Sequence, residues 1–293
     1  MAERDNSFSK SSHPLLEPLH MQRRTFLNTT LAAGGLAVIP AANSTAAEDK
    51  AKPVRQLLEL RTYLLKDGKR GAFDAFASKA LIPALNRLGV RAVGVYHELL
   101  TPPATDAKPP ETKSVPAAFV VSPYADANQL AAVTAALASD AAYQQSAAEY
   151  LAVPATDPVF DRIESSVFLA FETMPKIEAP ANKPTLYNLR IYESHNEAAG
   201  QKKIEMFNKG EIAIFRRVGL TPVFFGEAVI GARLPNLTYL LAFSDEAARA
   251  TAWNTFRADS EWKTLKAMPE YEDKKIVSKI TNKLLTPAEY SQI

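Results

Sequence analysis

The sequence predicts an α+β protein built from two ferredoxin-like βαββαβ repeats that close on each other as one barrel within the chain. The first observation behind this prediction is that three short segments recur in the same order and at nearly constant spacing, which indicates a duplication. The recurring pairs are Leu60-Arg61-Thr62-Tyr63 and Leu189-Arg190-Ile191-Tyr192, Arg87-Leu88-Gly89-Val90 and Arg217-Val218-Gly219-Leu220, and Asp140-Ala141-Ala142-Tyr143 and Asp259-Ser260-Glu261-Trp262. The second observation is that strand and helix periodicities follow each other in each half in the order β-α-β-β-α-β.

The closure of the barrel follows from the faces of the two sheets. A ferredoxin-like repeat carries both of its helices on one sheet face, so the other face of an isolated repeat would be a large apolar patch. Two repeats in one chain can bury these faces against each other, and their covalent link raises the effective concentration of that pairing. We therefore expect the repeats to pair within the chain, while further oligomerisation remains open.

The first repeat is predicted over residues 55–172. Alternating residues indicate strands, and apolar residues at three- and four-residue steps indicate helices. Strands are expected over 56–65, 90–99, 117–122 and 160–171, with one helix after the turn at 66–68 and another capped by Asp126. Pro83 should kink or break the first of these helices, and Gly89 should end it.

A segment rich in Pro, Lys and Ala, residues 173–184, is predicted to link the repeats. The second repeat is predicted over residues 185–286. Its strands are expected at 185–193, 221–230, 237–243 and 273–285, and its helices at 198–218 and 245–267. The long loop of the first repeat at 101–116 is shortened to 231–235 in the second.

Composition narrows the range of functions. The chain has 293 residues, of which 23% are charged and 47% hydrophobic, which is typical of globular rather than disordered proteins. The formal net charge of +2 provides no general attraction to nucleic acid, so we expect no nucleic-acid partner. The sequence contains no cysteine, which excludes disulfides, thiolate metal sites and a cysteine nucleophile.

Residues 1–47 have the pattern of an export signal. Arg23 and Arg24 precede Phe26 and Leu27, an apolar run follows, and small residues fill positions 41–47. Paired arginines followed by Phe-Leu resemble a twin-arginine signal in particular. The apolar run is shorter than the roughly 20 residues of a transmembrane helix, so we expect no stable membrane anchor after cleavage. The mature protein should be periplasmic or extracellular, and residues 1–20 are either an over-extended start or a long leader.

Several motifs resemble the NIPSNAP domain. They are the strand opening Glu59-Leu60-Arg61-Thr62-Tyr63, the segment Arg87-Leu88-Gly89-Val90, and the Trp-containing helix 252–262, and the similarity extends from about residue 55 to about residue 285. The resemblance implies the dimeric α/β-barrel superfamily, which includes haem-degrading and quinone-type monooxygenases and chlorite-dismutase-like haem proteins. It implies no particular reaction, because no enzymatic reaction is established for NIPSNAP-like proteins and fold does not imply function.

Four residues of the two opening strands are candidates for binding a ligand. Alternation places Arg61 and Tyr63 on one face of the first strand and leucines on the other, and Arg190 and Tyr192 repeat the arrangement. We expect the leucine faces to meet the helices, so that the Arg/Tyr faces point into the space between the sheets. There the arginines could bind a carboxylate or another anion, with the tyrosines as hydrogen-bonding neighbours. The alternative is that Arg61 pairs with Glu59 or another acid and only bridges the sheets.

The remaining candidates carry weaker signals. His97 is retained as a candidate ligand-binding residue, although both His97 and His195 fit surface or capping positions and neither has a second metal ligand at a recognisable spacing. Trp253 and Phe256 form a helical stripe that is more typical of a core than of a cofactor site. No Gly-rich phosphate loop is present, and no metal or cofactor is evident, although haem remains open through the resemblance.

These observations favour an exported barrel that binds a small ligand or a protein over an enzyme, because no catalytic constellation is recognisable. The alternative is a monooxygenase or haem-handling enzyme of the dimeric α/β-barrel type, and a purely structural module is a third interpretation. The interior of the barrel distinguishes them: a packed interior indicates structure or surface binding, whereas a cavity indicates a ligand.

Overall fold

The structure of the chain, a computed structural model, describes residues 53–99 and 116–293, and Lys50–Ile293 form one compact unit. The predicted export signal, with Arg23, Arg24, Phe26 and Leu27, lies outside the described residues, as does the loop at 100–115. No helix in the described part of the chain is both long and apolar enough to cross a membrane.

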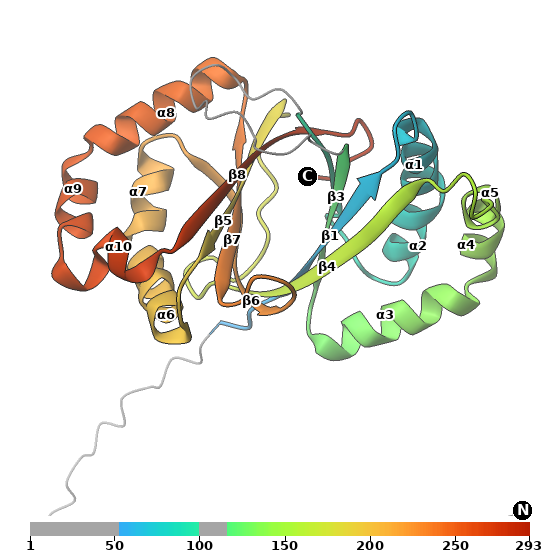
Figure 1. The fold of residues 1–293 in the computed structure, drawn as a ribbon, viewed down its shortest axis with the longest axis horizontal. Helices are drawn as coiled ribbons and strands as arrows, with labels where there is room; N and C mark the ends of the chain where they lie inside the picture. Colours follow the sequence, from blue (N-terminus) through green and yellow to red (C-terminus); the bar gives the residue numbers. More distant parts are fainter. Residues whose placement is uncertain (1–52, 100–115) are drawn as a thin grey trace, which may run out of the picture. The chain divides into compact units, whose positions relative to one another are not determined.

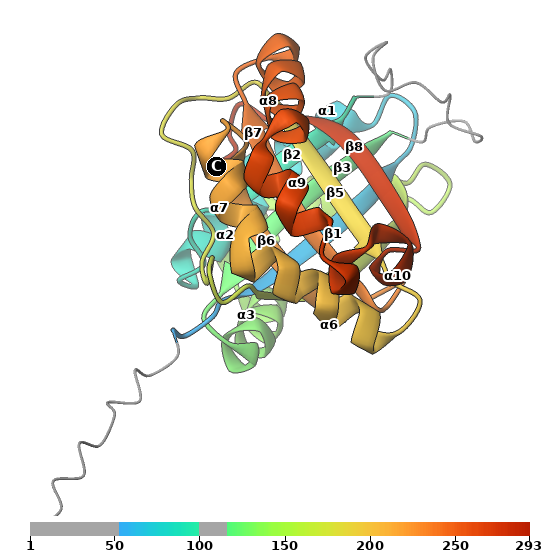
Figure 2. The ribbon, with the colours of Figure 1, turned by 90° about the vertical axis from the view of Figure 1, so that its left-hand side faces the viewer.

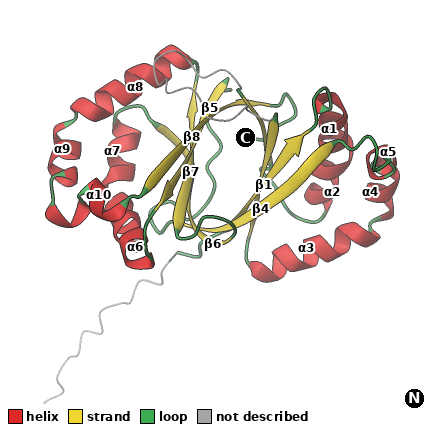
Figure 3. Ribbon diagram, in the orientation of Figure 1, coloured by secondary structure: helices red, strands yellow, loops and turns green. Residues whose placement is uncertain are grey.

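Eight antiparallel strands form a closed barrel at the centre of this unit (Figure 3). The strands are β1 (Leu57–Leu65), β2 (Gly94–Glu98), β3 (Ala117–Tyr124), β4 (Phe160–Ala170), β5 (Leu186–Glu193), β6 (Thr221–Ile230), β7 (Asn236–Phe243) and β8 (Lys279–Pro287). Each repeat contributes the ferredoxin-like order, β4-β1-β3-β2 in the first and β8-β5-β7-β6 in the second. The pairs β2·β8 and β4·β6 join the two sheets, so the predicted fold class is confirmed.

The helices cover two opposite sides of the barrel (Figure 1). The first repeat contributes α1 (Arg70–Phe76), α2 (Ile82–Arg87), α3 (Ala127–Ser139), α4 (Ala141–Ser146) and α5 (Ala148–Leu151). The second contributes α6 (Glu197–Met206), α7 (Ile212–Arg217), α8 (Glu246–Ala258), α9 (Ser260–Lys266) and α10 (Asp273–Ile276). Figure 2 shows the helices of the second repeat lying in front of the strands, so each repeat keeps its helices on the outer face of its own sheet.

Of the two effects expected of Pro83, a kink or a break in the first helix, the break does not occur. A π-helical turn, Ala77–Leu81, connects α1 to α2, and the backbone N–H of Ile82 donates to the carbonyl of Ala77. The wider turn accommodates a residue that lacks an N–H and would crowd the preceding carbonyl. Since the second repeat has the same turn at Phe207–Glu211, where no proline stands, Pro83 is compatible with the turn rather than its sole cause.

Two expected elements of the second repeat are also corrected. The helix expected at 245–267 is interrupted at Asp259, whose side chain accepts a hydrogen bond from the backbone N–H of Trp262 and so caps α9. The last strand begins at Lys279 rather than at Asp273, because Asp273–Ile276 form the short helix α10. In the first repeat α4 and α5 lie in a segment for which no helix was predicted.

The predicted direction of the strand faces is the reverse of the observed one. Leu58 and Leu60 of β1 pack inside the barrel, whereas Tyr63 packs under the helices, with its ring centre 4.8 Å from that of Phe73. Arg61 shares the outer face with Tyr63. The alternation of residues along β1 could not show which face of the strand points into the barrel, because the barrel interior and the helix layer are both apolar environments.

One end of the barrel interior is packed. Inward-facing residues that fill it include Leu58, Val121, Tyr187, Leu240 and Leu285. The last residue, Ile293, joins this core, and its backbone carbonyl accepts a hydrogen bond of 3.2 Å from the Tyr96 hydroxyl. The backbone N–H of Gln292 also donates to the Val93 carbonyl, at 3.0 Å. The C-terminal residues therefore pack against this end of the barrel.

Candidate functional site

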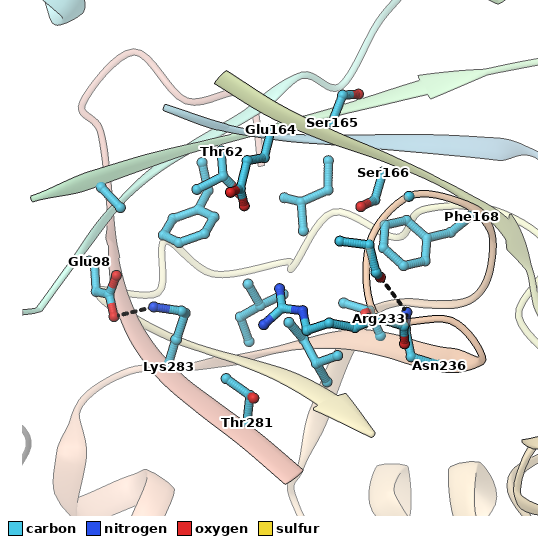
Figure 4. A pocket seen from close by; sticks show the side chains of 18 of the residues that line it. Thr62, Glu98, Glu164, Ser165, Ser166, Phe168, Arg233, Asn236, Thr281 and Lys283 are labelled. Carbon is cyan, nitrogen blue, oxygen red and sulfur yellow. Dashed lines mark hydrogen bonds and ion pairs between the residues drawn. The ribbon is translucent and has the colours of Figure 1, made fainter. Parts of the chain in front are cut away.

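A cavity of about 660 Å³ occupies the open end of the barrel (Figure 4). Its base is apolar and is formed by the inward residues nearest the packed core, Leu60, Phe119, Phe168 and Leu189. Its upper wall is mostly polar and includes Thr62, Glu98, Glu164, Ser166, Asn236, Thr238, Thr281 and Lys283. An apolar base with a few polar groups above it is the usual composition of a small-molecule site.

Strand alternation explains why these side chains converge. Successive inward positions lie two residues apart, so β1 presents Thr62 above Leu60, and β8 presents Thr281 and Lys283 above Leu285. Apolar residues occupy these positions where the barrel is packed, and most of the polar ones lie near the open end, where Leu64 and Ala117 remain apolar. The cavity is therefore a direct continuation of the barrel core.

An ion pair crosses one of the two junctions between the repeats. The Nζ atom of Lys283 on β8 lies 2.6 Å from Oε1 of Glu98 on β2, and both side chains are partly buried. Lys283 also lies 5.8 Å from the ring centre of Phe119, within the range of a cation–π contact. The pair holds a cation and a carboxylate at fixed places in the cavity wall without adding net charge.

The β6–β7 hairpin adds a second cation, Arg233. Figure 4 shows its side chain reaching into the space between Glu164 and Thr281. Within the described residues its guanidinium forms no ion pair. The Asn236 side-chain amide donates to the backbone carbonyl of Arg233 at 3.1 Å, which ties the hairpin to the start of β7.

Gly231 sets the path of this hairpin against β4. Its φ of +141° is a conformation that residues with a Cβ rarely adopt, and a Cβ here would lie 2.8 Å from the Cβ of Ser166. Only glycine allows the hairpin to approach β4 this closely. This approach places Arg233 over the cavity, so the position of its guanidinium depends on the glycine at position 231.

The described cavity lining contains no histidine, tyrosine, methionine or cysteine. A haem iron in this cavity would therefore find none of the usual axial ligands. Across residues 53–99 and 116–293 no group of three His, Asp or Glu side chains is arranged to hold a metal ion. The chemistry that the lining offers is charge, hydrogen bonding and apolar contact.

Arg61 and Tyr63 lie outside the cavity, under the helices of the first repeat. The Arg61 Nε atom donates to Oε1 of the buried Glu59 at 2.6 Å, and the hydroxyls of Tyr124 and Ser165 also donate to that carboxylate. Burial lowers the pKa of Arg61, but the adjacent Glu59 carboxylate more than offsets this, and the pKa is raised overall. The alternative that Arg61 pairs with Glu59 is the observed one, although the contacts join β1, β3 and β4 of one sheet rather than the two sheets.

Arg190 and Tyr192 lie together under the helices of the second repeat. An Arg190 Nη2 atom donates to the Tyr192 hydroxyl at 3.2 Å, and the guanidinium lies 4.7 Å from the ring centre of Trp253. These residues line a second pocket, of about 440 Å³, between β5 and the helices α8 and α9. The four predicted residues thus form two separate pairs, one under each helix layer.

The two histidines differ in environment. His97 is 3% exposed, and its Nε2 atom lies 2.8 Å from Oδ1 of Asp74 on α1, so the expected surface or capping position is wrong for this residue. Burial, the main cause, lowers the pKa of His97, and Asp74 opposes the shift. The ring lies edge-on to Phe73, on the helix side of β2 and away from the cavity. His195 is exposed, as expected.

Arg233, Glu98 and Lys283 line the cavity together but are not among the site residues that the sequence predicts. The shortened loop at 231–235 was a usable signal for Arg233, because it occupies the place of the long loop of the first repeat. Lys283 and Glu98 stand in strands that come from different repeats, so their contact depends on how the sheets join.

Comparisons with known proteins agree with this fold. The NIPSNAP family model matches residues 187–292, and no curated protein matches the chain. Two solved structures are similar over 80% of the chain, each with a TM-score of 0.53. One is a provisionally named monooxygenase from Fusobacterium nucleatum, 10% identical and covered over 93% of its length. The other is a provisionally named monooxygenase from Lactobacillus acidophilus, 9% identical and covered over 94%.

A NIPSNAP-like domain protein from Burkholderia xenovorans is 23% identical over 38% of this chain and 90% of its own, with a TM-score of 0.34. At their low identity the two longer matches show a shared fold and nothing about activity. The described barrel thus has the fold of those two proteins, and its second half, residues 187–292, is similar to the NIPSNAP family.

Proposed function

We propose that this protein is an exported NIPSNAP-like barrel that binds a small molecule with an apolar body and an anionic end in the open end of its barrel. The observation that carries the proposal is the cavity of about 660 Å³, which has an apolar base and the Arg233 side chain above it. A molecule of this kind can bury its apolar body against Leu60 and Phe168 while its anionic end meets Arg233.

The charges in the wall support a preference for an anion. Lys283 is paired with Glu98, so these two groups cancel. Glu164 lies 3.6 Å from Arg162 on the same strand, which reduces its repulsion of an anion. Arg233 remains as the cation that reaches into the cavity, and a guanidinium binds a carboxylate through two parallel hydrogen bonds.

Octanoate is a suitable probe because it combines an aliphatic chain with a carboxylate, and 1-octanol is its uncharged counterpart. Isothermal titration calorimetry on the mature protein should show saturable octanoate binding and at least about tenfold weaker binding of 1-octanol. Arg233→Met should weaken octanoate binding by about tenfold or more and leave 1-octanol unaffected. Arg70→Met, which removes an exposed arginine from α1, is the matched control and should bind like the wild type.

Failure of octanoate to bind, or equal binding in the Arg233→Met and wild-type proteins, would reject an anion site at Arg233. If octanoate and 1-octanol bind equally, the cavity recognises only the apolar body.

Export is the second part of the proposal, and it rests on the pattern of residues 1–47. Arg23→Lys/Arg24→Lys should abolish transfer of the full-length protein to the periplasm, because the twin-arginine signal requires the arginine pair. Cell fractionation followed by immunoblotting measures this directly. Unchanged export of the double variant would exclude the twin-arginine route.

A monooxygenase is the alternative function, and the shared fold of the two provisionally named monooxygenases is the observation that favours it. The side chains of the cavity lining do not suit a haem-dependent form, because they offer no axial ligand. The appropriate assay is oxygen consumption with a hydroquinone substrate. Uptake that Thr62→Phe abolishes by filling the cavity would support this alternative over simple binding.

A further inference from the structure

One edge of strand β4 lacks a neighbouring strand over half of its length. On one side β4 pairs with β1 from Phe160 to Leu169, whereas on the other side it pairs with β6 only from Val167 to Ala170. β6 ends at Ile230, which lies opposite Val167. In the part of the chain that the structure describes, no strand therefore pairs with the second edge of β4 before Val167, and residues 161–165 are all exposed. The unpaired N–H and C=O groups of such an edge can pair with a strand of another chain.

The side chains along this edge alternate between its two faces. Arg162 and Glu164 share one face, and Ile163 lies on the other, where it is 42% exposed. Arg162 and Glu164 lie 3.6 Å apart at their closest charged atoms, which is too long for a hydrogen bond. Their side chains are 68% and 46% exposed, so both can reach a charged group of another chain.

The order of these three residues is self-complementary. If the β4 edges of two copies pair antiparallel about Ile163, Arg162 of each copy lies directly opposite Glu164 of the other, on the same face. The two-fold symmetry forms this ion pair twice, and it buries Ile163 of one copy against Ile163 of the other. A pairing centred on Arg162 or on Glu164 would place like charges opposite each other, so the charges select the register centred on Ile163.

The second repeat does not have this complementarity. Ile280 of β8 corresponds to Ile163, because each lies opposite the tyrosine of the opening strand of its repeat. The neighbours of Ile280 are Lys279 and Thr281, so the same pairing between two β8 strands would form no ion pair. Pairing of β4 with β8 of another copy would be heterologous and would continue from copy to copy. The charges therefore favour a closed dimer through the first repeat.

We propose that the protein forms a two-fold dimer through the exposed edge of β4, where a second copy of the chain adds its own β4 as an antiparallel neighbour. Hydrogen bonds between the two backbones hold the strands together, and the Arg162–Glu164 pairs fix their register. Glu164 also lines the barrel cavity, so the interface borders that cavity. The association requires no ligand, and its test is independent of octanoate binding.

Sedimentation velocity of the mature protein over a range of concentrations measures the association and should show a monomer–dimer equilibrium. Ile163→Lys places two like charges at the centre of the interface and should raise the dissociation constant of the dimer by about tenfold or more. Ile280→Lys is the matched control, because it makes the same change at the equivalent exposed position of the second repeat. It should dimerise like the wild type.

A mixing experiment tests the contact between copies directly. Arg162→Glu and Glu164→Arg each place like charges opposite each other in their own dimer, so each variant alone should dimerise about tenfold or more weakly than the wild type. An equimolar mixture of the two variants brings opposite charges together at both positions and should recover the association. Each chain keeps its own substitution in the mixture, so an effect within one chain cannot produce this recovery. Circular dichroism confirms that each variant is folded.

A monomer at every concentration, or a dimer that Ile163→Lys leaves unchanged, would overturn the proposal. A mixture that associates no better than its two components would overturn the pairing of Arg162 with Glu164. Species larger than a dimer that Ile280→Lys abolishes would show that β4 pairs with β8 of another copy, and they would overturn the closed dimer.

Discussion

Arg217 and Asp259 form an ion pair of 2.9 Å, and Arg87 and Asp140 form the same pair at 2.9 Å in the first repeat. Each aspartate also caps the helix that follows it, by accepting a hydrogen bond from the backbone N–H three residues later. Two of the three recurring sequence segments are therefore the two ends of one structural link. The link joins the end of α2 to the start of α4 in the first repeat, and the end of α7 to the start of α9 in the second.

This link should depend on pH. The backbone N–H of Trp262, and then Arg217, lower the pKa of Asp259 from its ordinary value of 3.8. The contact therefore contributes fully above that value and is lost as the pH falls through the lower pKa of the folded state. The difference in melting temperature between the wild type and Asp259→Asn should be largest near neutral pH and should shrink as the pH approaches about 3. A difference that does not vary with pH would show that the charge of Asp259 contributes nothing.

Removing one partner of the buried ion pair of Lys203 and Glu211 should cost much more stability than replacing both partners. Both side chains are at most 4% exposed, and their charged atoms lie 3.0 Å apart. Lys203→Met leaves a buried carboxylate without its partner and should lower the free energy of unfolding by about 3–5 kcal/mol. The double variant Lys203→Met/Glu211→Leu should regain most of this loss, as measured by urea denaturation. A double variant no more stable than Lys203→Met would contradict the interpretation.

His97 should make the protein less stable in mild acid. Its environment includes Asp74, which accepts from it, Arg70, and Tyr290, whose hydroxyl donates to the same Asp74 oxygen at 2.5 Å. Burial lowers the pKa of His97 below 6.5, so below about pH 6.5 the unfolded state binds a proton that the folded state does not. The free energy of unfolding should fall from about pH 7 to pH 5.5, and the fall should be smaller in His97→Gln. Equal slopes in the two proteins would assign the effect to other groups.

Gly231 should be sensitive to a single methyl group. Gly231→Ala combines an unfavourable φ of +141° with a Cβ 2.8 Å from that of Ser166, and it should cost about 1–3 kcal/mol and weaken octanoate binding by displacing Arg233. Gly71→Ala in α1 is the matched control, since no atom lies within 4 Å of its added Cβ, and it should be neutral or stabilising. Thermal unfolding and calorimetry measure the two effects, and equal behaviour of the variants would contradict the role of Gly231.

The sequence predicted the elements and their order because these depend on local patterns. Asp126 was identified as a cap from its position before an apolar helix, and the structure shows it accepting from the backbone N–H of Gln129. The strand at 221–230 was predicted with the observed bounds, because it is long and follows a glycine that ends a helix. The closed barrel followed from the duplication and from the sheet face that each repeat would otherwise expose.

The cavity could not be predicted, because it depends on which face of each strand points inward. Leu60 and Tyr63 are both buried, one in the barrel and one under the helices, so polarity did not separate their faces. Because the observed strand faces are the reverse of the predicted ones, Arg61 and Arg190 lie outside the barrel and not in its interior. The contact of Lys283 with Glu98 depends in addition on the β2·β8 register, which joins residues of different repeats.

The central claim is that a small molecule binds in the hollow end of the barrel, and titration of octanoate into Thr62→Phe by isothermal calorimetry tests it most directly. Thr62 lines the cavity, so a phenylalanine ring there occupies the space of the ligand, whereas Thr134→Phe on the exposed face of α3 is the matched control. We predict that Thr62→Phe loses octanoate binding by more than about tenfold while Thr134→Phe and Arg190→Met bind like the wild type. Unchanged affinity in a folded Thr62→Phe protein would contradict the claim.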